Sequence, residues 1–361
     1  MPRPTRPVLV LPLLLGLPLG TPAEPDAGPK PAATPVAAVV ETTLGTEGGH
    51  IRQFAFDGDE RTCFVSGRPP GEADHFTLLL DRPVAAGAIA ATTGRPGGVD
   101  RLDAGSLEVS ADGSAFEPLA TFAEGVARGD AQGRAVRAIR IKPGAGATHP
   151  LAVREFAIAA DPPVATFRYP VEFAVDTSDA PELEAWGAKV GRLCERAYPM
   201  INEELKGGGH TAPHRVRLRL RNDYHGVAAA GGGGIVGSVK FFKDHPDDVG
   251  AMIHETAHIV QGYGYNAGPS WLVEGVADYV RFIKYEPEKI GPINGHRAHY
   301  NTGYRVSAAF LAYLAEKYDK QIVLKLNALM RDGAYKESAF RDLTGKPVRE
   351  LDEEWRATLR R

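Results

Sequence analysis

The residues best suited to chemistry in this chain lie in the segment His254-Glu255-Thr256-Ala257-His258. Two histidines four positions apart on a helix project from the same side and can bind one metal ion together. The glutamate beside the first histidine can reach a water molecule on that metal, as in zinc-dependent hydrolases. The pattern therefore predicts a catalytic zinc site in which His254 and His258 are ligands and Glu255 is a general base.

Two further carboxylates follow in the segment Trp271-Leu272-Val273-Glu274-Gly275-Val276-Ala277-Asp278. A helix over residues 270–283 places Glu274 and Asp278 one turn apart on one face. We predict that Glu274 is the third metal ligand and that Asp278 accepts the second ring N–H of a histidine ligand. Two histidines and one glutamate favour a catalytic site over a structural one, because structural zinc is usually enclosed by four cysteine or histidine ligands. The alternative is a polar helix pair in which Asp278 pairs with Arg281 and Glu274 is solvated.

The predicted metal-binding helix has a start signal at Pro246, Asp247 and Asp248 and a stop signal at Gly262. Between these signals apolar residues surround most of the helix, which indicates a largely buried element. Burial of two imidazoles and a carboxylate without a partner would be costly. A bound metal ion removes that cost.

Length and charge limit the number of domains and the classes of partner. The 361 residues suggest two domains with extra segments, and the net charge of −3 with no concentrated Lys/Arg run makes nucleic acid an unfavourable partner. Residues 1–23 have the basic and apolar regions of a secretory signal, and the apolar stretch, residues 8–20, is too short to span a bilayer. We therefore expect a secreted protein whose mature chain has no membrane span. Residues 24–38, rich in Pro and Ala, are predicted to be a linker.

Residues 39–160 show short apolar runs separated by turn dipeptides, which predicts a β-sandwich. The expected strands are 75–80, 88–92, 106–110, 135–141 and 153–159. The oxygens of Asp57, Asp59 and Thr62 could bind a structural Ca²⁺, or they could simply hydrogen-bond the turn. The segments 56–64, 107–116 and 138–141 resemble the discoidin, or coagulation factor type C, module. That resemblance implies a jelly-roll sandwich that binds a glycan or a cell surface.

Residues 161–361 are predicted to form an α+β domain. We expect an extended segment at 167–175, a helix at 181–205 and a strand at 215–220. A further strand at 235–242 precedes the predicted metal-binding helix. This strand is predicted to lie at a sheet edge, where it could pair with a peptide, although an interior strand would show the same pattern.

The blocks 254–264, 274–281, 303–311 and 343–348 occur in the order found in the plant basic secretory protein family, which this part of the chain resembles over about residues 165–358. The resemblance implies a zincin-like fold of the gluzincin type and peptide-bond hydrolysis. It also implies that His254, His258 and Glu274 hold zinc and that Asp278 orients a histidine. A donor for the oxyanion is expected in the following segment, where Tyr300, Tyr304, His296 and His299 are the candidates.

The sequence therefore predicts a secreted zinc peptidase in which a jelly-roll sandwich precedes an α+β catalytic domain. The alternative is an adhesion protein that binds a glycan or a surface and whose peptidase-like domain hydrolyses nothing. Replacement of Glu255 by Gln separates the two.

Overall fold

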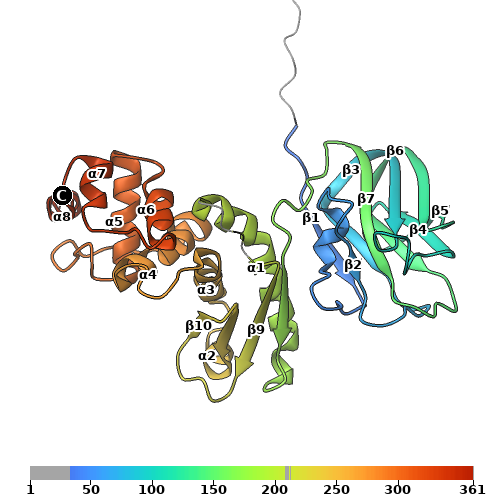
Figure 1. Cartoon of the computed structure of the whole chain (residues 1–361), viewed down its shortest axis with the longest axis horizontal. Coiled ribbons are helices and arrows are strands. Elements are labelled where there is room, and N and C mark those ends of the chain that lie inside the picture. Colours follow the sequence, from blue (N-terminus) through green and yellow to red (C-terminus); the bar gives the residue numbers. More distant parts are fainter. Residues whose placement is uncertain (1–32, 208–210, 212, 361) are drawn as a thin grey trace, which may run out of the picture.

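The computed structural model describes residues 33–207, 211 and 213–360, which form two regions (Figure 1). Each region has its own hydrophobic core. The predicted signal peptide (1–23) and residues 24–32 of the predicted linker lie outside the described residues. No helix in the described part of the chain is long and apolar enough to cross a membrane.

The first region is all-β, as predicted. Its elements are β1 (Ala38–Thr42), η1 (Arg52–Phe56), β2 (Phe64–Val65), β3 (Phe76–Thr93), β4 (Gly105–Ser110), β5 (Glu117–Thr121), β6 (Val126–Pro143) and β7 (Ala152–Asp161). The first part of β3 pairs with β1 and with the end of β6, while its second part pairs with β7 and with the start of β6. The two long strands therefore pass from one layer to the other, and the apolar core lies between the layers.

The predicted strands 75–80 and 88–92 are one strand of 18 residues. The exposed residues Asp81, Arg82 and Pro83 lie in a register shift between Leu79 and Val84, so the chain bends there without leaving the sheet. The predicted separation was wrong because a bulge produces the same polar interruption as a turn. Strands β1, β2 and β5 were not predicted, and each is five residues long or shorter.

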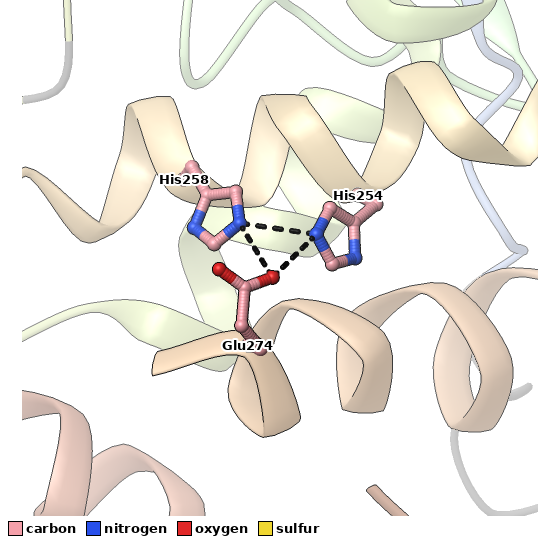
Figure 2. A group of neighbouring side chains, drawn as sticks. All are labelled: His254, His258 and Glu274. Atoms are coloured by element: carbon pink, nitrogen blue, oxygen red, sulfur yellow. Dashed lines mark hydrogen bonds and ion pairs between the residues drawn. The ribbon is translucent and has the colours of Figure 1, made fainter. Parts of the chain in front are cut away.

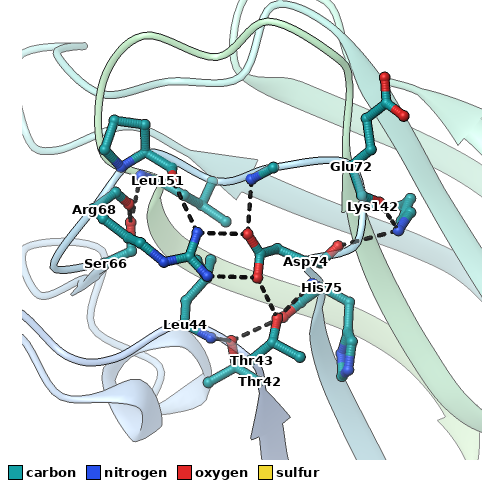
Figure 3. A network of polar contacts seen from close by, with 12 residues as sticks. Thr42, Thr43, Leu44, Ser66, Arg68, Glu72, Asp74, His75, Lys142 and Leu151 are labelled. Carbon is teal, nitrogen blue, oxygen red and sulfur yellow. Dashed lines mark hydrogen bonds and ion pairs between the residues drawn. The ribbon is translucent and has the colours of Figure 1, made fainter.

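One loop of the sandwich is held by a carboxylate (Figure 3). The Arg68 guanidinium donates to both oxygens of Asp74, at 2.6 and 2.9 Å, and the Thr43 hydroxyl donates to the same carboxylate at 2.8 Å. The hydrogen bonds from Arg68 hold the pKa of Asp74 well below its usual value. This pairing ties the loop before β3 to the end of β1 and closes one end of the sandwich.

The second region contains a four-stranded sheet and a set of helices. Its first elements are β8 (Glu172–Asp176), η2 (Pro181–Leu183), α1 (Glu184–Leu205), β9 (Arg215–Arg221), β10 (Ala228–Gly231), β11 (Gly234–Ser238) and α2 (Val239–Asp244). They are followed by α3 (Gly250–Gln261), α4 (Ser270–Tyr279), the π-helix η3 (Val280–Tyr285), η4 (Pro287–Lys289), α5 (Tyr304–Lys317), α6 (Ile322–Arg331), α7 (Ala339–Thr344) and α8 (Val348–Leu359). The strand order is β10-β11-β9-β8, with β10 antiparallel to β11.

The structure corrects the predicted strand at 235–242 in two respects. The strand ends at Ser238, whose side chain accepts a hydrogen bond from the Phe241 N–H and so caps the short helix α2. It also lies inside the sheet, between β10 and β9, so the predicted edge position was wrong. The edges of the sheet are β8 and β10, and β10, which pairs with β11, is a short run of small residues without the apolar pattern of a strand. The predicted extended segment 167–175 becomes a strand only at Glu172.

The two regions are joined by a buried polar cluster that the sequence did not predict. The Arg52 guanidinium of η1 pairs with Glu195 of α1 and lies 3.5 Å from Glu172 of β8. Both glutamates are buried, and the Thr46 hydroxyl donates to Glu172 at 2.6 Å. Each of these contacts joins the sandwich to the second region. The cluster therefore fixes how the two regions meet.

Candidate metal centre

Helices α3 and α4 position the candidate ligands. Every residue of α3 except His258 is buried, and the helix ends at Gly262, which has the left-handed conformation that favours glycine at this position. Helix α4 lies close to α5 because Gly275 has no side chain, and a Cβ atom there would come within 2.7 Å of Ser307. The helix begins at Gly250 and not at the predicted acidic start, since Asp248 pairs with Arg281 instead.

Three ligand atoms converge between the two helices (Figure 2). The Nε2 atoms of His254 and His258 lie 3.0 Å apart, and Glu274 Oε2 lies 3.2 and 3.5 Å from them. Among the described residues, these three form a group of His, Cys, Asp or Glu side chains whose ligand atoms all lie within 4.8 Å of one another. The structure thus brings together the three residues that the sequence singled out as ligands.

The other ring nitrogens have partners that determine the tautomer of each histidine. His254 Nδ1 lies 2.6 Å from Asp278 Oδ1, and His258 Nδ1 lies 2.7 Å from Gln261 Oε1. The Gln261 amide donates its own N–H to the Val273 carbonyl at 3.0 Å, so its oxygen faces the imidazole. When the rings are neutral, each Nδ1 therefore carries the proton, and both Nε2 lone pairs are available beside a carboxylate oxygen. This donor set fits a zinc ion.

Gln261 is the site residue that sequence reasoning missed. It is buried at the end of α3, three residues after His258. The signal that could have found it is this spacing, because residues three apart on a helix are neighbours. The alternative pairing of Asp278 with Arg281 is not found, since Arg281 pairs with Asp248 and Glu286.

The histidine and glutamate ligands shift one another's pKa values when no metal is bound. Burial disfavours the protonated form of His254, but hydrogen bonds to Asp278 and Glu274 outweigh it and raise its pKa to about 9. Burial likewise opposes ionisation of Glu274, and hydrogen bonds from His254 and His258 lower its pKa to about 2. The ligands thus hold a proton at neutral pH that a metal ion must displace.

We expect replacement of Gln261 by Leu to weaken zinc binding about 10- to 100-fold, because the residue that orients a ligand histidine is lost while the ligands remain. The matched control is Thr256→Val on the same helix, whose hydroxyl donates to the Met252 carbonyl at 2.7 Å. Competition with a chromophoric chelator measures both dissociation constants. Equal constants for the two variants would show that Gln261 does not orient His258.

A cavity of about 1060 Å³ opens over the three ligands. Glu255 lines it, with 8% of its surface exposed, as do Asp278, Tyr304 and the edge strand β10. Two of the exposed large apolar residues of the described chain, Val227 and Tyr304, also lie on its wall. The cavity therefore combines a ligand set, a free carboxylate and an unpaired strand edge.

The structure separates the candidates for the oxyanion donor. Tyr304 is 60% exposed, its ring centroid lies 6.3 Å from that of His254, and the negative charge of Glu274 raises its pKa. Tyr300 instead packs against Trp271 and Phe310 and is not among the residues that line the cavity. The exposed His296 and His299 also lie outside it, and His299 Nδ1 lies 3.0 Å from Asp352. The geometry favours Tyr304.

The predicted calcium site forms a hydrogen-bonded turn. The Thr62 hydroxyl donates to Asp57 at 2.9 Å, and Arg61 donates to both oxygens of Asp59. Glu155 of β7 accepts from the Gly58 N–H at 3.1 Å, a neighbour that the sequence did not indicate. These contacts account for the residues through the chemistry of the turn. Calcium binding stays a prediction, and a calcium titration monitored by thermal unfolding checks it.

Glu155 makes the stability of the sandwich depend on pH. Burial, with repulsion from Asp57, raises its pKa to about 7, so the folded protein holds its proton more tightly than the unfolded chain does. Protonation of Glu155 therefore stabilises the folded state. This contribution to the free energy of unfolding is complete below about pH 4.3, the pKa of glutamate in an unfolded chain, and it is lost as the pH rises through 7. We expect Glu155→Gln to raise the melting temperature at pH 8 in EDTA but not at pH 4. The exposed Glu117→Gln is the control, and equal shifts for both variants would refute this assignment.

Comparisons with known proteins give separate matches for the two regions. The sandwich is similar to a carbohydrate-binding module of a family 31 glycoside hydrolase from Clostridium perfringens, with 20% identity, a TM-score of 0.30, and 34% of this chain and 92% of that chain covered. It is also similar to a chitosan-binding module from Paenibacillus sp. IK-5, with 16% identity, a TM-score of 0.29, and 34% and 93% covered. Among curated proteins no sequence matches. Residues 203–355, which carry both helices of the metal centre, match the family described as a peptidase of plants and bacteria, so the resemblance predicted from the sequence is confirmed over that range.

Proposed function

We propose that the protein is a secreted zinc-dependent peptidase. The observation that carries this proposal is the cavity in which His254, His258 and Glu274 converge beside Glu255 and beside the edge of a sheet. The match of residues 203–355 to a peptidase family supports it independently. Secretion rests on the basic and apolar pattern of residues 1–23.

The roles of the residues follow from their positions. His254, His258 and Glu274 would hold the metal, while Asp278 and Gln261 keep the two imidazoles in the tautomer that offers Nε2. When bound, zinc makes a water molecule more acidic and polarises a carbonyl group. Glu255 accepts a proton from the water that attacks the peptide carbonyl, and it returns one to the nitrogen of the leaving amine as the C–N bond breaks.

Tyr304 would stabilise the negative charge on the substrate oxygen. Its hydroxyl is protonated at neutral pH, since its pKa lies above the usual value, and it can therefore donate a hydrogen bond. Its exposed position on the cavity wall leaves it free to turn towards a bound peptide. The neighbouring Tyr300 is held by aromatic packing and is a structural residue in this proposal.

The substrate would be aligned by β10. This strand is paired on one side only, with β11, and it lines the cavity. An extended peptide that pairs with the open edge gains backbone hydrogen bonds that do not depend on its side chains. The small residues Ala228, Ala229 and Ala230 leave the edge accessible.

The test is cleavage of a peptide mixture by protein loaded with zinc, with products identified by mass spectrometry. We expect new peptide termini that are absent after the metal is removed with a chelator and that return when zinc is restored. Determination of the N-terminus of the exported protein checks secretion. No cleavage of any peptide by the zinc-loaded protein would favour the alternative, a non-catalytic protein that binds a glycan or a surface.

A ligand-binding role for the sandwich is a second candidate function. It is favoured by a hollow of about 560 Å³ in which Phe54, His50 and two arginines, Arg61 and Arg95, lie together. An aromatic side chain beside a few polar groups is typical of small-ligand sites. A glycan array probed with wild type and with Phe54→Ala tests this role.

A further inference from the structure

Strand β9 presents a row of arginines to solvent. Its sequence alternates, so that Val216, Leu218 and Leu220 are buried in the core while Arg215, Arg217, Arg219 and Arg221 lie on the opposite face of the sheet. We call these four residues the arginine row. They line a groove of about 460 Å³, together with the turn that joins β10 to β11. A row of like charges at this spacing repels itself unless anions neutralise it.

The arginines of the row differ in how closely carboxylates approach them. Arg219 lies 3.4 Å from Asp176 and 3.5 Å from Asp179, and Arg221 donates to Asp223 at 2.7 Å. Arg215 comes no closer than 4.0 Å to Glu172, and this glutamate already receives hydrogen bonds from Thr46 and Arg52. The Arg215 guanidinium also donates to the Gly48 carbonyl, which carries no net charge.

Arg217 has no carboxylate within ion-pair distance anywhere in residues 33–207, 211 and 213–360. Its partners in register are Ala174 on β8 and Gly234 on β11, and neither carries a polar side chain. The Arg215–Arg217 end of the row therefore carries uncompensated positive charge, and both side chains are exposed to solvent.

The open end of the row is connected to the candidate metal centre. Gly231, Gly232 and Gly233 of the β10–β11 turn line both the cavity over the metal ligands and the arginine groove. Strand β9 lies two places from β10 in the sheet, which corresponds to about 10 Å. An extended peptide covers that distance in about three residues. A chain that pairs with β10 and then crosses the turn thus reaches Arg217.

We infer that the arginine row binds acidic side chains of the peptide substrate at positions about three residues beyond the part that pairs with β10. This inference rests on the proposed peptidase function. Alternate residues of an extended peptide repeat every 6.6–6.8 Å, roughly the spacing of successive arginines in the row. Aspartate or glutamate at alternate positions therefore faces Arg217 and Arg215 in turn, and a guanidinium can bind each carboxylate through two parallel hydrogen bonds.

The experiment compares two fluorogenic peptides with one core sequence. One carries an alternating Glu-Ala extension and the other a Gln-Ala extension, each three residues from the core and tested on either side of it. We expect a KM about fivefold lower for the acidic peptide with an unchanged kcat, as two exposed charge pairs would produce, and a difference that disappears at high salt. Arg217→Gln lowers this preference to about twofold, because one of the two charge pairs remains, and leaves cleavage of the Gln-Ala peptide unchanged. Arg221→Gln, whose side chain already has an aspartate partner, retains it.

Binding is also measured without turnover, by fluorescence anisotropy of the acidic peptide on the Glu255→Gln protein with and without Arg217→Gln. Weaker binding in the double variant supports the inference. An acidic preference that is as large in Arg217→Gln as in the wild type overturns the inference. It is also overturned if the protein binds polygalacturonate through Arg217 but does not bind the acidic peptide. Cleavage of the Gln-Ala peptide reports the proposed function separately, so a failure of the arginine row cannot be mistaken for a failure of the peptidase.

Discussion

Replacement of Glu255 by Gln is expected to lower kcat/KM for peptide cleavage by about 10²- to 10⁴-fold, the usual contribution of a general base. The amide has the shape of the carboxylate but cannot accept a proton from water. Glu255 lines the cavity and is not one of the three converging ligands, so zinc binding should be unchanged. Steady-state kinetics and metal analysis of the same preparation measure the two effects.

The control for this variant is Glu204→Gln, which makes the same chemical change at a half-buried ion pair with Lys284. It should retain wild-type kinetics. Full activity in Glu255→Gln with zinc still bound would remove Glu255 from the mechanism. Loss of both activity and zinc would show that Glu255 helps to hold the metal, and the proposed proton transfer would lose its support.

Replacement of Arg52 by Met is expected to lower the free energy of unfolding by about 3–5 kcal/mol, the range for breaking a buried ion pair from one side. The Arg52 side chain is 14% exposed and lies between two buried glutamates that belong to the other region. Without it both carboxylates stay buried with less compensation. Urea denaturation followed by tryptophan fluorescence reports the second region, which contains all three tryptophans, Trp186, Trp271 and Trp355.

Arg196→Met is the matched control, because Arg196 also joins the two regions through an ion pair, with Asp81 at 2.5 Å. Both partners there are substantially exposed, so the expected loss is at most about 1 kcal/mol. If the two variants lose the same small amount of stability, the buried cluster does not hold the regions together. A large loss confined to Arg52→Met supports the described interface.

The metal centre could be predicted from the sequence to the extent that its geometry is local. His254 and His258 share one helix turn, and Glu274 and Asp278 share another, so helical periodicity alone aligns each pair. Only tertiary packing brings the two helices together. That they would meet was predicted from the order of motifs along the chain, which resembles that of a zinc peptidase family. Gln261 was missed because a glutamine carries no metal-binding signal, although its side-chain oxygen lies 2.7 Å from His258 Nδ1.

Features formed by contacts between distant segments could not be predicted. Arg52 meets Glu195 across 143 positions, and nothing in either local pattern marks the pair. The edge strand β10 consists of alanines and a glycine, whose weak strand propensity hid it, while the apolar pattern of β11 was assigned to the edge. The polar interruption in β3 had the composition of a turn, and only pairing with β6 shows that it is a bulge.

The most direct test of the proposed function is the zinc content per chain of the mature protein, purified without chelators, beside that of His258→Ala. Inductively coupled plasma mass spectrometry measures the zinc content, and circular dichroism checks that the variant is folded. We expect about one zinc per wild-type chain and none in the variant, since loss of one of three protein ligands sharply weakens a zinc site. A wild-type protein that neither contains zinc nor binds it when it is added would contradict the zinc peptidase.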